Sequence, residues 1–465
     1  MKLFDVRSHW ERVWQSAMLM GVLGNGIRFG ANLMLLPLVL DPRRLTSSEL
    51  AMWAVFVTLG SFGNLADFGF GSTIPRIYSY LWAGADDFDA EGAPVSKPDG
   101  KPNIARIQQL NATVRSLYLK LSLAAMFLLA VAGTIYLVKP ACESGYALKV
   151  WWLWGLFLIA IGYNLATSYW MMAAQGLNRV RDMEIAAVLS GLSYVGCAAI
   201  LLLLGAGLSA MVAATFLKGI VMRQKCRQVC ELIVPRPAEE VPPDPSIIRK
   251  LWPNAFKFGV LSVGGYLLMS CPILICRAFL GEKVTASFFL TSQVGVYAVS
   301  LASLWLTVKW PQIAILRTQG RLEEMASLFA RRLGLVMVSF VALALVVFFA
   351  GNALLEWRGK NTRLLAPPFL AFYLIYLAQN IFYVQFGALA FTENVVPFFK
   401  IAIFTGIAAC ALSLTLTPWF GLWGLLISPL IAETICSNWY TVRRGFQGQP
   451  LTPRQFALAA VSGGA

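Results

Sequence analysis

The amino-acid sequence predicts an all-α polytopic membrane protein with twelve transmembrane helices in two six-helix lobes and both termini in the cytoplasm. Three observations predict this fold class: the composition, the recurrence of long apolar runs, and the unequal distribution of Lys and Arg between the loops. Of the 465 residues, 58% are hydrophobic and only 13% are charged, whereas soluble domains carry about 25% charged residues. The composition therefore excludes an ordinary soluble protein.

Apolar runs of about 20 residues, long enough to cross a bilayer as a helix, follow one another along the chain. We expect the first run to be a retained span, because it continues without the small-residue cleavage site of a signal peptide. The twelve predicted spans are residues 17–40, 50–74, 118–138, 151–174, 185–204, 207–224, 254–276, 286–308, 333–351, 365–388, 399–417 and 419–440.

The basic residues predict the orientation of these spans. Of the 38 Lys and Arg, 28 lie on the side of the N-terminus, 9 lie on the opposite side, and Arg28 lies within a span. Loops rich in Lys and Arg stay in the cytoplasm, and an even number of spans then places both termini there. The net charge of +15 reflects this topology and the attraction of basic loops to membrane lipids. Nucleic acid is not an expected partner.

A polar, proline-rich segment divides the chain. Residues 223–253 contain six prolines and predict a cytoplasmic linker. The linker would join an N-terminal lobe, residues 1–222, to a C-terminal lobe, residues 254–442, which a cytoplasmic tail, residues 443–465, follows. A second polar segment, residues 83–115, predicts a surface loop that turns helical toward the third span.

The two halves resemble each other weakly. A shift of 236 residues sets Pro75 on Pro311, and a shift of 214 residues sets Gly207 on Gly421. Each half would then contain six spans that run in the same sense. Parallel repeats of this kind place a substrate site near the membrane midplane, at the interface of the repeats.

Charged residues at membrane depth are candidate functional groups. Arg28, in "GNGIRFGANLMLLPL", lies deepest, and a charge there costs at least about 2.5 to 3.5 kcal/mol unless it faces a cavity or a partner. Either a water-filled cavity or a buried ion pair with Asp67 or Glu433 satisfies this requirement. Lys218 is close enough to a span end to reach the interface instead, and Arg277 is equally compatible with an anchoring role.

Uncharged polar side chains recur in the spans, where they either connect helices or line a wet lumen. Cations outnumber carboxylates at depth, and arginine binds phosphate oxygens in a bidentate manner, so the pattern favours an anionic substrate. Asp67 and Glu433 are candidates for an ion pair or for ion coupling. The candidate substrate-binding residues are Asn25, Arg28, Lys218, Arg277, Gln293, Gln379 and Asn380.

No metal site or cofactor is predicted. Cys226 and Cys230 lie four residues apart, but the single histidine, His9, supplies no further ligand for a metal at that place. The eight cysteines are scattered through apolar segments and are expected to act as small buried hydrophobes. A membrane-embedded transferase usually depends on a histidine at membrane depth, and the single histidine, His9, precedes the first span. We therefore disfavour a transferase and predict that the protein is not an enzyme.

Residues 32–77 carry a family resemblance and read "NLMLLPLVLDPRRLTSSELAMWAVFVTLGSFGNLADFGFGSTIPRI". Pro37 ends the first span, "TSSELAMW" begins the second, and "DFGFG" from Asp67 to Gly71, with Arg76, ends it. This pattern resembles the Wzx-type polysaccharide flippases (PST family) of the multidrug/oligosaccharidyl-lipid/polysaccharide (MOP) superfamily. Diffuse similarity covers nearly the whole chain.

The resemblance implies a bacterial inner-membrane flippase that moves undecaprenyl-pyrophosphate-linked oligosaccharide repeat units by alternating access through a cationic lumen. Such a protein would serve O-antigen, capsule or exopolysaccharide synthesis beside a polymerase and a chain-length regulator, and Arg28 would match a first-span arginine of related flippases. Many relatives carry an acidic residue in the seventh span, where this chain has Cys271 and Pro272, so no coupling site carries over there. The alternatives are a cation-coupled multidrug exporter of the same superfamily and a non-transporting scaffold for polysaccharide assembly.

Overall fold

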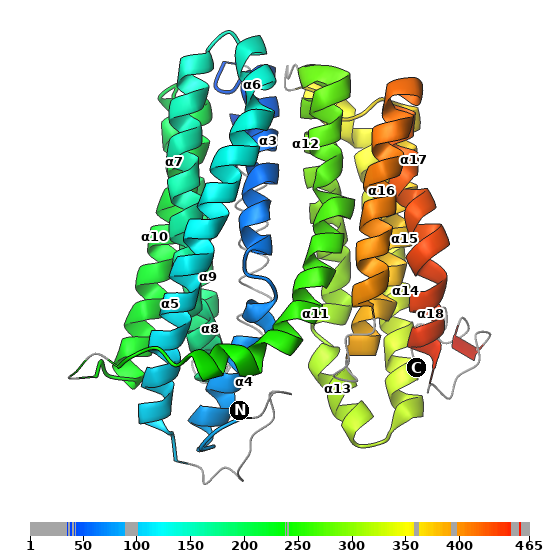
Figure 1. Cartoon of the computed structure of the whole chain (residues 1–465). Coiled ribbons are helices and arrows are strands. Elements are labelled where there is room, and N and C mark those ends of the chain that lie inside the picture. Colours follow the sequence, from blue (N-terminus) through cyan, green and yellow to red (C-terminus); the bar gives the residue numbers. More distant parts are fainter. Residues whose placement is uncertain are drawn as a thin grey trace, which may run out of the picture. The chain divides into compact units, whose positions relative to one another are not determined.

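The computed structural model describes residues 35, 38–39, 41, 43–88, 101–237, 239, 241–357, 362–391, 398–447 and 455–456 (Figure 1). The helices are, in chain order, α3 (Ser47–Leu65), α4 (Phe70–Trp82), α5 (Ile104–Leu128), the π-helix η1 (Leu129–Gly133), α6 (Thr134–Glu143), α7 (Ala147–Ala166), α8 (Tyr169–Gly176), α9 (Val180–Leu203), α10 (Leu208–Ile233), α11 (Pro245–Met269), α12 (Cys271–Thr307), α13 (Trp310–Thr318), α14 (Leu322–Trp357), α15 (Pro367–Phe391), α16 (Phe399–Phe420), α17 (Leu422–Ala432), the π-helix η2 (Glu433–Asn438) and α18 (Trp439–Phe446).

The predicted all-α polytopic membrane fold is confirmed. Seven helical segments of the described residues are long and apolar enough to cross a membrane, and a helix satisfies all its own backbone hydrogen bonds in lipid. The total of twelve spans and the cytoplasmic termini remain predictions, because most of the first predicted span, residues 17–40, lies outside the described residues. The chain forms two compact units, Met1–Val263 and Gly264–Ala465, which divide within α11.

The first unit is built around a core shared by α4, α5, α8 and the start of α11. Phe70, Tyr78 and Tyr118 are among its fully buried side chains. Within this unit α5 lies beside α7, and α9 pairs with α10 (Figure 1). The core thus fixes the turn that joins α3 to α4, where Asp67 lies.

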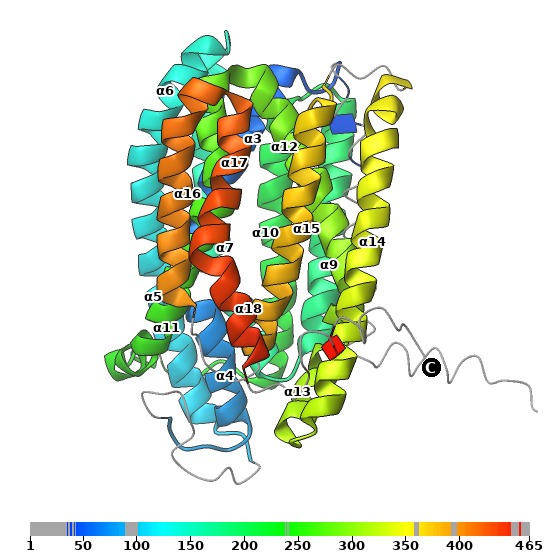
Figure 2. The same cartoon turned by 90° about the vertical axis from the view of Figure 1, so that its right-hand side faces the viewer.

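The second unit has its own core of large aromatic side chains. Phe329 of α14 and Phe386 of α15 meet edge to face, with ring centroids 5.4 Å apart, and both are fully buried. Figure 2 shows α16 beside α17 and α15 beside α14 within this unit. The outer face of α14 is apolar and exposed, with Val346 62% and Phe349 73% exposed, as expected of a helix that faces lipid.

The structure divides one predicted span. Residues 50–74 form α3 and α4 rather than a single helix, and the break falls at Ala66–Gly69. Phe68 has a φ of 46° and Gly69 a φ of 79°, and residues in this left-handed region cannot continue a right-handed helix. The Asp-Phe-Gly-Phe-Gly motif is therefore a turn.

Helices extend into the segment that the sequence predicts as a linker. Helix α10 continues to Ile233 and α11 begins at Pro245, so helices occupy both ends of the predicted segment 223–253. Pro at the first helical position and an acidic residue before it are favourable helix starts, and Asp244 accepts a hydrogen bond of 2.9 Å from the backbone N–H of Ser246. These capping interactions convert the proline-rich sequence into the beginning of α11.

Two glycines support the internal repeat. Gly207 precedes α10 with φ 58° and ψ −132°, and Gly421 precedes α17 with φ 57° and ψ −133°. The 214-residue shift aligns these two positions. Their matching conformations are what a duplicated helical hairpin requires, because this backbone region is accessible almost only to glycine.

Candidate functional site

A buried carboxylate lies between α15 and the C-terminal helices of the second unit. Glu433 is only 4% exposed and begins the π-helix η2. Asn380 of α15 donates a hydrogen bond of 2.9 Å from Nδ2 to Glu433 Oε1. Among the described residues, Oε2 has no hydrogen-bond partner. A buried carboxylate that is only partly satisfied can take up a proton or a cation.

A polar stripe on α15 faces this carboxylate. Gln379 donates a hydrogen bond of 3.1 Å to the Thr434 hydroxyl, next to the bond from Asn380 to Glu433. Tyr376 interacts with Glu433, and its buried hydroxyl lies near the carboxylate without the geometry of a normal hydrogen bond to any described residue. Residues three and four apart lie on one face of a helix. Tyr376 lies three residues before Gln379 and four before Asn380. This spacing is a sequence signal for Tyr376, which is not among the predicted site residues.

The local backbone around Glu433 is irregular. Pro429 within α17 has no N–H to donate to the preceding turn, and the helix changes to π-type hydrogen bonding at residues 433–438. The buried amide nitrogen of Asn438, at the end of η2, also has no hydrogen-bond partner among the residues described. Single-turn π segments within α-helices frequently mark functional sites. We therefore regard η2 with its α15 stripe as the candidate functional site of the second unit.

Asp67, the other deep carboxylate, lies in the turn between α3 and α4. Its Oδ2 accepts a hydrogen bond of 2.8 Å from the backbone N–H of Gly71, and its Oδ1 accepts a hydrogen bond from the Tyr118 hydroxyl. Tyr118 of α5 is fully buried. Both carboxylate oxygens therefore have donors from the same unit, and Asp67 connects the α3–α4 turn to α5.

Helix α11 covers this turn. The Phe68 ring stacks on Trp252 with centroids 5.6 Å apart and an interplanar angle of 15°. A Cβ at Gly69 would lie 2.4 Å from the carbonyl oxygen of Ala255, so the close approach of α11 requires glycine there. The motif that carries the sequence resemblance thus positions α11 as well as Asp67.

No protein-family model matches the chain, and no curated protein matches its sequence. Solved structures do match. The MATE multidrug transporter DinF-BH is 13% identical, with 96% of each chain covered and a TM-score of 0.61. A MOP superfamily transporter from Pyrococcus furiosus, described as having a binding pocket of reverse polarity, is 14% identical and covers 94% of this chain and 98% of its own, with a TM-score of 0.57. An outward-facing MATE family transporter is 14% identical over 94% of this chain and 96% of its own, with a TM-score of 0.56.

The chain has the fold of the MOP-superfamily transporters. Because the matches extend over nearly the whole length of both chains, the MOP fold includes both compact units. Structures at 13 to 14% identity share a fold with this chain without specifying its substrate. The resemblance to the polysaccharide flippases rests on the sequence motifs.

Three further predicted site residues lie on helices α10 and α12. Lys218 is exposed on α10 of the first unit, and its Nζ lies 5.8 Å from the ring centroid of Tyr194. Arg277 on α12 of the second unit is only 6% exposed, which favours a role inside the unit over that of a lipid-facing anchor. Gln293 is half-buried on the same helix.

The structure brings together three predicted residues, Gln379, Asn380 and Glu433, within the MOP fold. The predicted residues Asn25 and Arg28 lie outside the described residues. In the part of the chain that the structure describes, no group of three His, Cys, Asp or Glu side chains could hold a metal ion. Cys271 Sγ of α12 lies 3.7 Å from Cys410 Sγ of α16.

Proposed function

We propose that the protein is a flippase of the bacterial inner membrane that moves an undecaprenyl-pyrophosphate-linked oligosaccharide from the cytoplasmic to the periplasmic leaflet. It works by alternating access of the MOP fold rather than by chemical conversion of its substrate. Arg28, Lys218 and Arg277 attract the pyrophosphate or acidic sugars. The amides of Asn25, Gln293, Gln379 and Asn380 hydrogen-bond sugar hydroxyls. A polymerase and a chain-length regulator act on the product.

The observation that carries the proposal is that protein donors already bind both deep carboxylates. Asp67 accepts hydrogen bonds at both oxygens from its own unit, and Glu433 is 4% exposed and bound by Asn380. A large organic cation would need an accessible carboxylate in order to offset its desolvation. Asp67 is half-buried, but both of its oxygens are hydrogen-bonded, and Glu433 is buried. The predicted cations, in contrast, suit an anionic headgroup that arginine binds in a bidentate manner.

The solved structures are compatible with more than one substrate class. The transporter from Pyrococcus furiosus is described as having a binding pocket of reverse polarity that suggests a different function. The MOP fold is thus not restricted to one polarity of pocket. This supports an anionic substrate for a chain whose sequence carries flippase-type motifs.

A cation-coupled multidrug exporter is the second candidate. It is favoured by the similarity to MATE transporters and by Glu433 Oε2, which lacks a hydrogen-bond partner among the described residues. A partly satisfied buried carboxylate fits a site that binds a coupling proton or cation. This candidate requires that Glu433 or Asp67 be essential and that Arg28 be dispensable.

Complementation of a deletion strain separates the two candidates. The variants Arg28→Ala, Asp67→Asn and Glu433→Gln are compared with the exposed Arg181→Ala as a charge-matched control for Arg28→Ala. Two readouts are recorded for each strain, the amount of surface polysaccharide and the susceptibility to cationic drugs, at membrane levels equalised by immunoblot. Arg28→Ala is expected to abolish surface polysaccharide with unchanged drug susceptibility.

The opposite pattern identifies the exporter. If Glu433→Gln or Asp67→Asn sensitises cells to drugs while Arg28→Ala leaves surface polysaccharide intact, the flippase proposal is wrong. If all variants resemble the control in both readouts, the protein acts as a scaffold, and transport by either route is excluded.

A further inference from the structure

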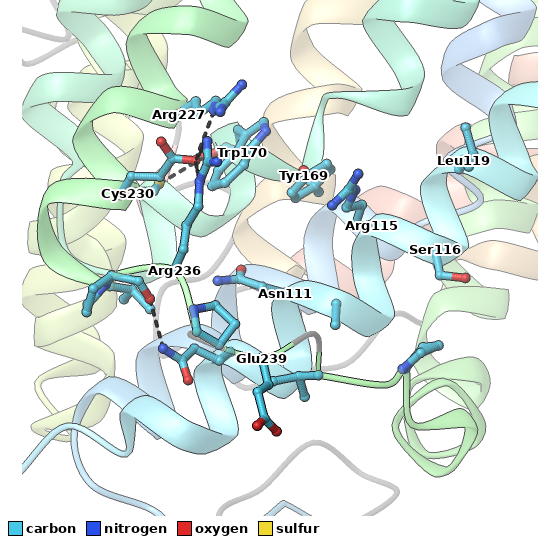
Figure 3. Close-up of a pocket in the computed structure, with 18 of the residues that line it drawn as sticks. Asn111, Arg115, Ser116, Leu119, Tyr169, Trp170, Arg227, Cys230, Arg236 and Glu239 are labelled. Atoms are coloured by element: carbon cyan, nitrogen blue, oxygen red, sulfur yellow. Dashed lines mark hydrogen bonds and ion pairs between the residues drawn. The ribbon is translucent and has the colours of Figure 1, made fainter.

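A cationic pocket of about 720 Å³ lies in the first unit, apart from the residues discussed so far (Figure 3). It is lined by one end of α5, by α8, by the last turns of α10 and by the segment that follows α10. Helices α5 and α10 both pack against α7 and α8. The pocket is therefore formed entirely within one compact unit.

Arginine dominates the charge of the pocket. Four arginines line it, Arg115, Arg223, Arg227 and Arg236, against two acids, Glu231 and Glu239. Glu231 Oε1 accepts hydrogen bonds from Arg227 Nε at 2.9 Å and from Arg236 Nε at 2.8 Å. One carboxylate thus holds two of the arginines in place.

The other two arginines have no carboxylate partner among the described residues. Arg223 lies over the Tyr163 ring, with its guanidinium carbon 5.2 Å from the centroid, and this contact leaves its positive charge uncompensated. Arg115 of α5 is exposed beside Tyr169, as Figure 3 shows. Both interact electrostatically with Tyr169, so their positive charges act on the same side of the pocket.

Trp170 contributes an unused hydrogen-bond donor. Its indole nitrogen is buried and has no hydrogen-bond partner among the described residues, although a buried indole N–H ordinarily has one. Trp170 lines the pocket beside Tyr169, and the two rings are 4.8 Å apart.

The pocket lies at the boundary of the predicted membrane region. Arg115 precedes the predicted span 118–138, and Arg227 follows the predicted span 207–224, on the side where Lys and Arg predict the cytoplasm. Leu119, which lines the pocket, is 53% exposed, and Leu123, one turn further along α5, is 59% exposed. A ligand with an anionic head and an apolar tail fits both surfaces.

We propose that this pocket binds the phosphate-bearing headgroup of an anionic lipid in the cytoplasmic leaflet. Arg115 and Arg223 bind the phosphate oxygens, and the acyl chains lie along the exposed face of α5. Basic pockets between transmembrane helices on the cytoplasmic side bind lipid headgroups in this way, and arginine is suited to planar, bidentate contact with phosphate. The proposal holds for any transported substrate and is independent of the function proposed above.

Native mass spectrometry of the full chain tests the proposal. The protein in detergent is titrated with phosphatidylglycerol or with phosphatidylcholine, and inorganic pyrophosphate serves as a soluble competitor. The test variant is Arg115→Gln with Arg223→Gln, which leaves no carboxylate of the described chain without its partner. The control is Arg181→Gln with Lys225→Gln, which removes the same charge from exposed positions of the same unit outside the pocket.

The native chain and the control are expected to prefer phosphatidylglycerol. The test variant is expected to bind it about thirtyfold more weakly, as expected for two removed basic contacts. If pyrophosphate displaces the lipid and binds the native chain on its own, the phosphate chemistry is upheld and the source is a soluble ligand. The proposal is wrong if neither ligand is preferred over phosphatidylcholine, or if the test and control variants bind equally. Equal thermal unfolding of both variants ensures that a loss of binding does not reflect misfolding.

Discussion

Replacing Asp67 and Tyr118 tests whether the acid of the Asp-Phe-Gly-Phe-Gly motif is structural or participates in transport. Asp67 accepts hydrogen bonds from Gly71 and from Tyr118, so the structure assigns it a role in holding the α3–α4 turn against α5. We expect Asp67→Asn and Tyr118→Phe both to lower stability and both to retain export, measured per folded molecule.

The size of the effect follows from the two hydrogen bonds. A hydrogen bond to a charged group contributes about 1.5 to 3 kcal/mol. Tyr118→Phe leaves the buried side of the carboxylate without that donor, so we expect a loss of about 2 kcal/mol. Asp67→Asn keeps one carbonyl acceptor, and we expect a loss of about 1 to 2 kcal/mol. The double variant should lose less than the two single losses together, because both substitutions perturb the same hydrogen bond between Asp67 and Tyr118.

Thermal unfolding in detergent and export in complemented cells are the two assays. Tyr118→Phe is the matched control, because it removes the hydrogen bond and keeps the acidic side chain. The structural role is refuted if Asp67→Asn abolishes export at unchanged unfolding temperature while Tyr118→Phe has no effect on either measurement.

Three further predictions concern other parts of the chain. Gly207→Ala should destabilise the protein by about 1 to 3 kcal/mol more than Gly421→Ala in denaturant unfolding. The two backbone conformations match, but only at Gly207 would a Cβ displace a buried acceptor, Glu49, whose Oε1 would lie 2.5 Å away. Equal losses of stability would contradict this prediction. Partial burial raises the pKa of Asp87, but hydrogen bonds from Lys250 and Arg106 lower it overall below its ordinary value of 3.8, and hydrogen bonds from Ser246 lower the pKa of Asp244 likewise. The stability that Asp87 and Asp244 contribute is complete above the ordinary pKa and is lost as the pH falls through the lower pKa values of the folded state. The double variant Asp87→Asn with Asp244→Asn should therefore show a smaller decrease of the unfolding midpoint between pH 6 and pH 3 than the native chain. An unchanged decrease would exclude the effect. Mild oxidation should join Cys271 to Cys410, whose sulfurs are 3.7 Å apart; a thiol titration should lose two free thiols, and Cys271→Ser should prevent that loss.

The membrane fold was predictable because it depends on local properties of the chain. Long apolar runs must be helical in lipid, where every backbone polar group has to be satisfied within its own segment. Breaks within the runs were harder to predict. The turn at Phe68 depends on a left-handed backbone that the close approach of α11 to Gly69 stabilises, and hydropathy does not report such contacts.

The candidate site was predictable only in part. The sequence selected Gln379, Asn380 and Glu433 separately, as residues too polar for their depth, and the structure joins them. Tyr376 lies three and four residues before Gln379 and Asn380, but this spacing alone is a weak signal, because tyrosine is common in apolar helices and its role depends on the opposite helix. The arginines of the pocket formed by α5, α8 and α10 were counted as topology signals, since they lie near span ends or in the predicted linker.

By itself, the sequence determined that this chain is a helical membrane protein of many spans and that basic groups outnumber acidic ones. Hydropathy and charge are properties of each residue and its near neighbours, so they can be read from the sequence without knowledge of the fold. The tertiary structure decided which charges are satisfied. Asp67 finds Tyr118 at a separation of 51 residues, and Glu433 finds Asn380 at a separation of 53 residues. A carboxylate in a membrane protein can stabilise a turn or bind a proton, and the surrounding hydrogen-bond donors decide between these roles. Packing between distant helices supplies donors such as Tyr118 and Asn380.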